Sequence, residues 1–333
     1  MKIGRALVPG PDGPTPRVIV ASADDGHGID LRGVERLRLQ RLGVGPVAAA
    51  RIAAAVVPES MAAAIEAGPA FLEAAQRAAA DTSGDAVVEL AAAALMAPLD
   101  PPSFRDFMAF AEHFETAYEL GGGQPPDVLY ELPVSYLANH EAIIGPEAEM
   151  PWPSYSRRMD YELELGIVIG RPGRDLTPEA AAGHIFGYTI LNDFSARDIQ
   201  MREMEGRLGP SKGKHFASAV GPWIVTADAL PGRLAMLARV NGETWSSAFS
   251  DSILWSIPEL VAWASAGEPL VPGALLGTGT VGGGCGLELG RQLEPGDVVE
   301  LEIEGIGVLR NTMGHPRETG WTPAARRPTG RHD

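Results

Sequence analysis

The hydrophobic pattern near the N-terminus changes from short apolar runs to longer Ala-rich stretches. The short runs at residues 2–8 and 16–22 are typical of strands. The Ala-rich stretches predict helices that pack on a core, at residues 47–56, 59–67, 69–80 and 85–95. Together these elements predict a small N-terminal α/β module over residues 1–97.

Prolines mark the end of this module. The connector holds three of them, Pro98, Pro101 and Pro102, which make it rigid. The segment at 104–120 then predicts a helix with Ser103 as its N-cap, and the glycines at 121–123 end it.

Further along the chain the pattern changes to short apolar runs separated by Gly and Pro turns. These runs predict strands at residues 132–136, 141–144, 161–170, 185–191, 219–226, 234–241, 297–303 and 306–310. Asn241-Gly242 indicates a hairpin turn, and residues 256–266 predict one amphipathic helix with Pro258 in its first turn. The expected fold class is α+β and mostly β, with a rolled mixed β-sheet or β-barrel over residues 98–318 and a loosely ordered tail at 319–333.

Two glutamates open the apolar run that ends at Gly170. Because successive side chains of a strand point to opposite faces, Glu162 and Glu164 share one face, and Leu163 and Leu165 lie on the other. Neighbouring carboxylates repel each other, and a cation between them lowers that cost. The pair therefore indicates either a site for a hard metal ion or a solvent-facing strand edge whose acids bind nothing.

A third carboxylate, Asp193, follows the predicted strand at 185–191, where a further oxygen ligand would be needed. Together with Glu162 and Glu164 it forms a set that contains neither Cys nor His. Such a set suits Mg²⁺, Ca²⁺ or Mn²⁺ and argues against Zn²⁺ or Cu²⁺. The alternative for Asp193 alone is a helix N-cap or a turn residue.

Composition and charge narrow the class of protein. The chain has 333 residues, of which 45% are hydrophobic, enough for one large domain or two unequal ones. A formal net charge of −16 argues against nucleic acid and anionic membrane surfaces as partners. The single cysteine, Cys285, excludes an internal disulfide and fits a reducing cytosol. No signal-peptide pattern and no bilayer-spanning apolar stretch is evident, so we expect a cytoplasmic protein.

His113 lies seven residues after Asp106 in the predicted helix, which would place both side chains on one helix face. Near an acidic metal site an imidazole is a natural general base, because its pKa lies near neutrality. The alternative is a histidine on the surface of that helix.

Two glycine-rich loops carry further candidates. In the loop at 209–214 the order of Gly and Lys differs from that of a phosphate-binding P-loop. We expect Lys214 to offset negative charge that develops on a substrate, and Lys212 to be a solvated loop lysine. The segment at 277–284 either lets its backbone approach a ligand or forms a surface turn. The sequence around Cys285 offers it no set of partners, which indicates a buried or inert thiol.

Five segments, taken in this order, resemble the fumarylacetoacetase (fumarylacetoacetate hydrolase) superfamily. They are YELELGIVIG, IFGYTILNDFSARDIQ, LGPSKGKHFASAVGPWIVT, LVPGALLGTGTVGGG and LEPGDVVELEIEGIGVLRNT. Asp106-Phe107 followed by His113 resembles the fumarylacetoacetase branch, and the residues at 132–136 match its next strand in type. The resemblance implies a rolled β core that is assembled as a homodimer and uses a divalent cation.

The resemblance also implies roles for individual residues. The implied metal ligands are Asp106, Glu162, Glu164 and Asp193, with Mg²⁺ as the first choice of ion and Ca²⁺ or Mn²⁺ as alternatives. His113 would activate water, Glu288 would orient it, and Lys214 would stabilise charge. The implied contacts to the substrate come from Arg197, Gln200, Tyr136 and Thr280.

The activity that the resemblance implies is hydrolysis of a carbon–carbon bond in a 1,3-dioxo substrate such as a β-diketone or an acylpyruvate. A second interpretation keeps the site but changes the reaction to decarboxylation, tautomerisation, isomerisation or dehydration of a 2-oxo acid through a metal-stabilised enolate. The expected partner is therefore a small oxo acid or diketone. A third interpretation, an inert binding protein, fits poorly with retention of all the acids, His113 and Lys214.

Two positions depart from the family's pattern. Met108 stands where fumarylacetoacetase has a substrate-binding Tyr, and Gly122 stands where it has a substrate-binding Arg. Both changes remove polar contacts to the distal carboxylate of the substrate. We therefore expect an acyl group that is less polar than that of fumarylacetoacetate, or differently shaped.

Overall fold

The structure is a computed structural model that describes residues 1–9, 13–22, 26–81, 83–90, 93–230, 232–318, 321 and 323–326. The predicted tail at 319–333 lies mostly outside these residues. The predicted fold class is confirmed: the chain is α+β with more strand than helix, and a small N-terminal domain precedes a rolled β body. The exact domain boundary at residue 97 stays a prediction.

The largest sheet runs through both parts of the chain. Its strand order is β4-β3-β2-β1-β14-β12-β11-β17-β6-β7, with β5 paired to β1 and β8 paired to β14. Its strands are β1 Lys2–Val8, β2 Thr15–Ala21, β3 His27–Asp30, β4 Val87–Glu89, β5 Ala94–Met96, β6 Phe104–Phe107, β7 Ser135–Leu137, β8 Ile143–Ile144, β11 Leu163–Ile169, β12 Ile185–Asn192, β14 Ser218–Thr226 and β17 Leu275–Gly277.

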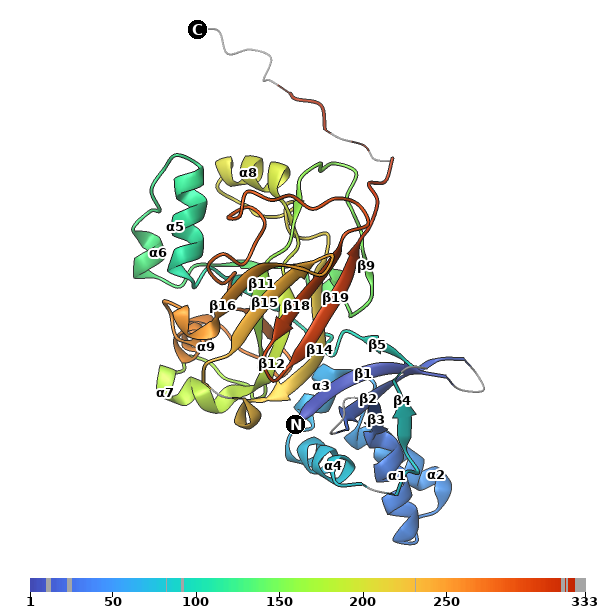
Figure 1. The fold of residues 1–333 in the computed structure, drawn as a ribbon. Coiled ribbons are helices and arrows are strands. Elements are labelled where there is room, and N and C mark those ends of the chain that lie inside the picture. The colour runs from blue at the N-terminus through green and yellow to red at the C-terminus, as the bar shows by residue number, and fades with distance from the viewer. Residues whose placement is uncertain are drawn as a thin grey trace.

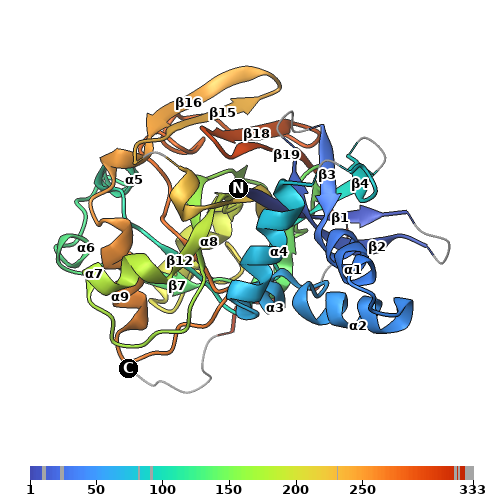
Figure 2. The ribbon, with the colours of Figure 1, turned by 90° about the horizontal axis from the view of Figure 1, so that it is seen from below.

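A second sheet packs on one face of the first. Its strand order is β16-β15-β18-β19-β9, and a short pair, β10 with β13, lies apart from both sheets. These strands are β9 Glu149–Met150, β10 Met159–Asp160, β13 Ser195–Ala196, β15 Ala235–Val240, β16 Glu243–Phe249, β18 Val298–Ile303 and β19 Gly307–Met313. Figure 2 shows β15, β16 and β18 as a layer on one side of β12. The core between the layers includes Leu165, Ile190, Met236 and Leu301.

Helices cover the other face of the large sheet and its edges. They are α1 Leu31–Arg41, α2 Pro46–Val56, α3 Met61–Glu66, α4 Pro69–Ala79, α5 Ala111–Leu120, α6 Val128–Glu131, α7 Pro178–Ala181, α8 Arg197–Glu205 and α9 Ile257–Ser265. Figure 1 shows the blue elements α1, α2 and α4 gathered beside β1 to β4, away from the rolled body. Because β1 pairs with β14, backbone hydrogen bonds connect this module to the body.

Most predicted elements are confirmed, but the N-terminal module holds one error and one omission. The helices predicted at 47–56, 59–67 and 69–80 are present as α2, α3 and α4. The helix predicted at 85–95 is wrong, because the segment forms β4 and β5, which pair with β3 and β1. Helix α1 does not follow from the sequence pattern; Asp30 caps its N-terminus, where its side chain accepts a hydrogen bond from the Arg32 backbone N–H.

In the body, the hairpin turn and the capped helix are confirmed. Asn241 and Gly242 join β15 to β16, both with positive φ, at 52° and 79°, as a tight hairpin turn requires. Pro258 lies in the first turn of α9, where Ser256 and Glu259 form a capping box. Both features are local, which explains why the sequence alone predicts them.

The single helix predicted at 104–120 is wrong, and so is its Ser103 cap. Residues 104–107 form β6, which runs parallel to β17, and the helix α5 begins only at Ala111. Asp106 therefore lies on a strand, and it shares no helix face with His113. The physical reason is tertiary: the two phenylalanines of β6 are buried in different core clusters on opposite sides of the sheet.

Candidate active site

Four carboxyl groups meet at one end of the large sheet. Asp106 lies on β6 and Glu164 on β11, while Glu162 directly precedes β11 and Asp193 directly follows β12. The antiparallel register pairs Leu163 with Asn192, so the start of β11 lies beside the end of β12. Each of the four acids offers an oxygen within 4.8 Å of those of the others, and all four residues are buried. We call this group the carboxylate cluster.

A glycine makes room for the carboxyl group that comes from β6. In the parallel pair of β17 with β6, Gly277 lies opposite Asp106. A Cβ atom at residue 277 would lie 2.2 Å from Asp106 Oδ1 and 2.7 Å from Leu191 Cδ2. Only a residue without a side chain therefore lets the Asp106 carboxyl reach the cluster.

Two acids of the carboxylate cluster face cations. Lys214 Nζ lies 2.5 Å from Glu162 Oε2 and 2.6 Å from Asp193 Oδ2. Arg197 Nη1 lies 2.7 Å from Glu162 Oε1. Burial alone would raise the pKa of Glu162, but the charges of Lys214 and Arg197 bring that pKa below its usual value. The same carboxylates raise the pKa of Lys214 above its usual value, although burial opposes this.

The other two acids have no such partner. Neither Asp106 nor Glu164 forms an ion pair with Lys or Arg within the described part of the chain. Burial, and then the charge of a neighbouring carboxylate, raises the pKa of both groups well above the usual value. The two carboxyls lie next to each other, and each is among the causes that shift the pKa of the other. Asp106 Oδ1 is buried and has no hydrogen-bond partner among the described residues.

These observations fit a divalent cation. A buried group of four carboxyls without nitrogen or sulfur ligands has the composition that Mg²⁺, Mn²⁺ and Ca²⁺ prefer. A cation would pair the unpartnered oxygen of Asp106 and would offset the repulsion between the Asp106 and Glu164 carboxyls. The carboxylate cluster is therefore consistent with a divalent metal site.

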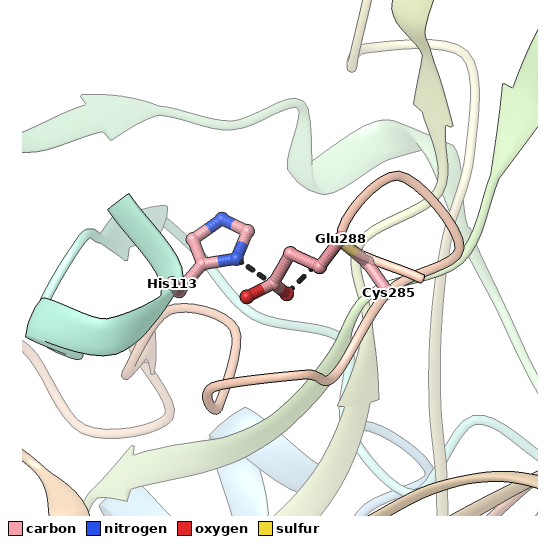
Figure 3. Close-up of side chains that lie close together, drawn as sticks. All are labelled: His113, Cys285 and Glu288. Carbon is pink, nitrogen blue, oxygen red and sulfur yellow. Dashed lines mark hydrogen bonds and ion pairs between the residues drawn. The ribbon is translucent and has the colours of Figure 1, made fainter. Parts of the chain in front are cut away.

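A second group lies next to the first and joins a helix to a loop. His113 on α5 points toward the Glu288 side chain, and Cys285 lies on the other side of that carboxyl group (Figure 3). His113 Nδ1 lies 2.9 Å from Glu288 Oε2, and the Cys285 thiol donates to the same oxygen at 3.2 Å. The Gly283 backbone N–H donates to Glu288 Oε1 at 3.0 Å. Both oxygens of Glu288 thus form hydrogen bonds, and Oε2 orients the imidazole ring of His113. We call His113, Cys285 and Glu288 the dyad group, after the pair that His113 and Glu288 form within it.

The remaining predicted residues surround the carboxylate cluster. Tyr136 donates its hydroxyl proton to Asp193 Oδ2 at 2.7 Å, and Thr280 donates to Glu164 Oε1 at 3.3 Å. Gln200 reaches the cluster only through Arg197, whose Nη1 donates to its side-chain oxygen at 3.0 Å. These contacts orient the acids, and their role toward a substrate stays a prediction.

Three residues that hold the site in place were missed by the sequence analysis. Asp160 accepts hydrogen bonds from Arg197 and from the backbone of residues 286 and 287, which fixes the loop near Glu288. Asn192 accepts from the Glu162 backbone, and Ser218 donates to Asp193. Asp160 had a visible signal, since Asp160, Glu162 and Glu164 alternate along the chain. The other two had none.

Among the helices of the described residues, none is long and apolar enough to cross a membrane.

Proteins similar to this chain carry the names of more than one kind of enzyme. The oxaloacetate tautomerase YisK of Bacillus subtilis is 33% identical over 241 residues, which cover 70% of this chain and 77% of the relative. A 2-hydroxyhepta-2,4-diene-1,7-dioate isomerase from Mycobacterium marinum is 28% identical with a TM-score of 0.64, covering 94% of this chain and 98% of the other. A fumarylacetoacetate hydrolase from Exiguobacterium antarcticum is 29% identical with a TM-score of 0.70, covering 94% and 99%.

The family model that matches this chain is described as fumarylacetoacetate (FAA) hydrolase C-terminal, and the match spans residues 103–314. This range contains both the carboxylate cluster and the dyad group, and it makes up more than half of the chain. The resemblance seen in the sequence is confirmed. The protein is an enzyme of the fumarylacetoacetate hydrolase family.

Proposed function

We propose that the protein is a metal-dependent tautomerase or isomerase of a small 2-oxo acid that carries an acidic proton on the carbon next to the oxo group. The observation that carries this proposal is the buried carboxylate cluster with Lys214 inside it and the dyad group beside it. The names of the relatives favour this reaction over the hydrolysis that the sequence analysis placed first, since they include an oxaloacetate tautomerase and an isomerase.

The donor set favours Mg²⁺ as the resident ion, held by Asp106, Glu162, Glu164 and Asp193. When bound, such an ion supplies Lewis acidity, which lowers the cost of forming an enolate from the oxo acid. The chain adds a positive charge of its own, since Lys214 lies between Glu162 and Asp193 and stabilises negative charge on a substrate oxygen.

The dyad group supplies the proton carrier. A keto–enol conversion removes a proton from one atom of the substrate and places a proton on another, so the site needs a group that exchanges protons near neutral pH. His113 is such a group, and Glu288 holds its Nδ1 at 2.9 Å, which fixes the ring orientation. Arg197 keeps Glu162 in place, and Gln200 and Thr280, which bond to Arg197 and Glu164, are the proposed contacts to the substrate.

The direct test is to follow conversion of enol-oxaloacetate to its keto form by ultraviolet absorbance, with the Mg²⁺-loaded protein. We expect acceleration over the uncatalysed rate that EDTA abolishes and Mg²⁺ restores. A panel of acylpyruvates and β-diketones, with product analysis by NMR, runs in parallel. Absence of tautomerisation together with cleavage of a member of the panel would replace this proposal by hydrolysis.

Hydrolysis of a carbon–carbon bond is the second candidate, and one observation favours it. The His113–Glu288 pair has the arrangement that activates a water molecule for attack on a carbonyl group, with the carboxylate orienting the base. A solved structure titled fumarylacetoacetate hydrolase is similar over 94% of this chain. Stoichiometric formation of two carboxylic products from an acylpyruvate would decide for this candidate.

A further inference from the structure

We propose that the dyad group is a second metal site, selective for Zn²⁺, through which zinc inhibits the enzyme while the carboxylate cluster keeps its own ion. The binding part of this proposal stands alone, and only the inhibition rests on the proposed function.

The donor atoms of the two groups differ in chemical softness. The dyad group offers an imidazole nitrogen, a sulfur and a carboxylate oxygen, all within 4.8 Å of one another. Nitrogen and sulfur donors with one carboxylate form a set typical of Zn²⁺, whereas the all-oxygen carboxylate cluster is typical of Mg²⁺. The same protein thus presents two adjacent sites that select different ions.

Two of the three ligand–ligand contacts are already close to those of a zinc site. Tetrahedral ligands at Zn²⁺ distances lie about 3.5 Å from each other. The contacts of Glu288 Oε2 with His113 Nδ1 and Cys285 Sγ are 2.9 Å and 3.2 Å, so they need to open by only a few tenths of an ångström. Zn²⁺ would take the place of the thiol proton, with three protein ligands and one position left for water.

A neighbouring backbone group holds Glu288 in place and leaves one of its carboxylate oxygens free to bind a metal ion. The Gly283 backbone N–H binds Glu288 Oε1 and leaves Oε2 to the dyad group. A backbone bridge between Glu162 and Cys285 places the two groups next to each other. Zinc at the dyad group therefore fixes His113 and Glu288 and stops the proton carrier, without displacing Mg²⁺ from its own ligands.

Cobalt spectroscopy tests the site directly, because Cys285 is the single cysteine of the chain. Co²⁺ is added to the full-length protein in saturating Mg²⁺, and the near-ultraviolet thiolate-to-cobalt charge-transfer band is recorded. We expect a band that saturates at one Co²⁺ per chain, disappears on addition of Zn²⁺ and is absent from Cys285→Ser. A folded wild-type protein that shows no thiolate band under these conditions overturns the proposal.

Zinc affinity supplies the second test, measured by competition with a chromophoric chelator in the same Mg²⁺ buffer. Loss of a direct ligand in Cys285→Ser or Glu288→Gln should weaken Zn²⁺ binding by more than the 10–100-fold that losing an outer partner typically costs. The matched control is Glu112→Gln, since Glu112 is an exposed acid beside Gly282 that offers no ligand to the dyad group. Unchanged zinc affinity in both ligand variants overturns the proposal, and circular dichroism confirms that each variant is folded.

The third test asks whether occupancy inhibits. Turnover is measured against Zn²⁺ at saturating Mg²⁺ and is normalised to the zinc-free rate of each variant. We expect the half-inhibitory Zn²⁺ concentration of Cys285→Ser to rise at least tenfold above that of the wild type, as the weakened site requires. Equal half-inhibitory Zn²⁺ concentrations in both proteins would assign inhibition to the carboxylate cluster and would overturn the inhibitory role of the dyad group. The cobalt and affinity tests need no substrate, so they stand even if the proposed reaction is wrong.

Discussion

The carboxylate cluster and the dyad group are built from different kinds of structure. The first rests on β6, β11 and the end of β12, neighbours or near neighbours in one hydrogen-bonded sheet. The second joins the helix α5 to a loop that follows three consecutive glycines, Gly282 to Gly284. A sheet fixes the spacing of charged groups, whereas a helix and a loop allow small adjustments. The difference fits the proposed roles, in which one group holds an ion and the other moves protons.

The two groups also differ in the balance between carboxyl groups and the groups that pair with them. The carboxylate cluster collects more acids than the cations Lys214 and Arg197 can pair, which leaves the carboxyl of Asp106 with an unpartnered oxygen. In the dyad group a backbone N–H, a thiol and an imidazole all converge on one carboxyl group, Glu288. The first arrangement has more carboxyl groups than cationic side chains, whereas the second gathers its polar groups around a single carboxyl group.

The largest effect is expected from Glu164→Ala, which removes a ligand from the carboxylate cluster. Turnover should fall to background and Mg²⁺ or Mn²⁺ binding should be lost in calorimetry, because Glu164 is one of the four proposed metal ligands. The control is Glu294→Ala at an exposed acid, which should change neither quantity. Undiminished cation binding in Glu164→Ala would contradict the ligand assignment.

His113→Ala should separate the two groups. Removal of the proton carrier should lower turnover by about 10²–10⁴-fold, the usual contribution of general acid–base catalysis. Metal affinity should stay nearly constant, since His113 is not part of the carboxylate cluster. Wild-type turnover in this variant would show that the imidazole does not act in the reaction. A variant that tautomerises but no longer cleaves acylpyruvates would restrict His113 to water activation.

Gly277→Ala tests whether the carboxylate cluster needs the space that Gly277 leaves for the Asp106 carboxyl. The added Cβ would lie 2.2 Å from Asp106 Oδ1, so the Asp106 carboxyl must move away from the other acids. Metal affinity should fall by about 10–100-fold, as for other changes that misplace a ligand. Gly183→Ala is the matched control, because a Cβ there meets nothing within 4 Å. Equal affinity in the two variants would mean that Asp106 is dispensable.

The contrast between a cluster built on strands and a group built on a helix and a loop explains which residues the sequence could place. Glu162 and Glu164 follow from the two-residue period of a strand, and Asp193 follows from the end of the next strand. The position of Asp106 on a strand does not follow, because the sequence at 104–107 adopts its conformation by parallel pairing with β17, which lies far along the chain. Local patterns therefore predict three acids correctly and misplace the fourth on a helix.

The dyad group shows the same limit more strongly. His113 and Glu288 are separated by 175 residues, and only family resemblance joined them before the structure did. Cys285 is buried, as expected, but it is not without a partner, since its thiol donates to Glu288 at 3.2 Å. A contact between one helix and a distant loop has no period in the sequence, so no pattern of polar and apolar positions indicates it.

Tyr136→Phe is expected to have the smallest effect and the sharpest control. It removes the hydroxyl that donates to Asp193 at 2.7 Å, while Lys214 and Ser218 still contact that carboxylate. Metal affinity should fall by about tenfold, the low end for loss of an outer partner. Tyr130→Phe removes an equally short hydroxyl contact, 2.7 Å to Glu115, but at an exposed pair, and should leave affinity unchanged. A tenfold loss of metal affinity in Tyr136→Phe alone would show that side chains around the carboxylate cluster, as well as the backbone of the sheet, hold the acids in position. Equal metal affinities in the two variants would show that the strands alone hold the acids in position.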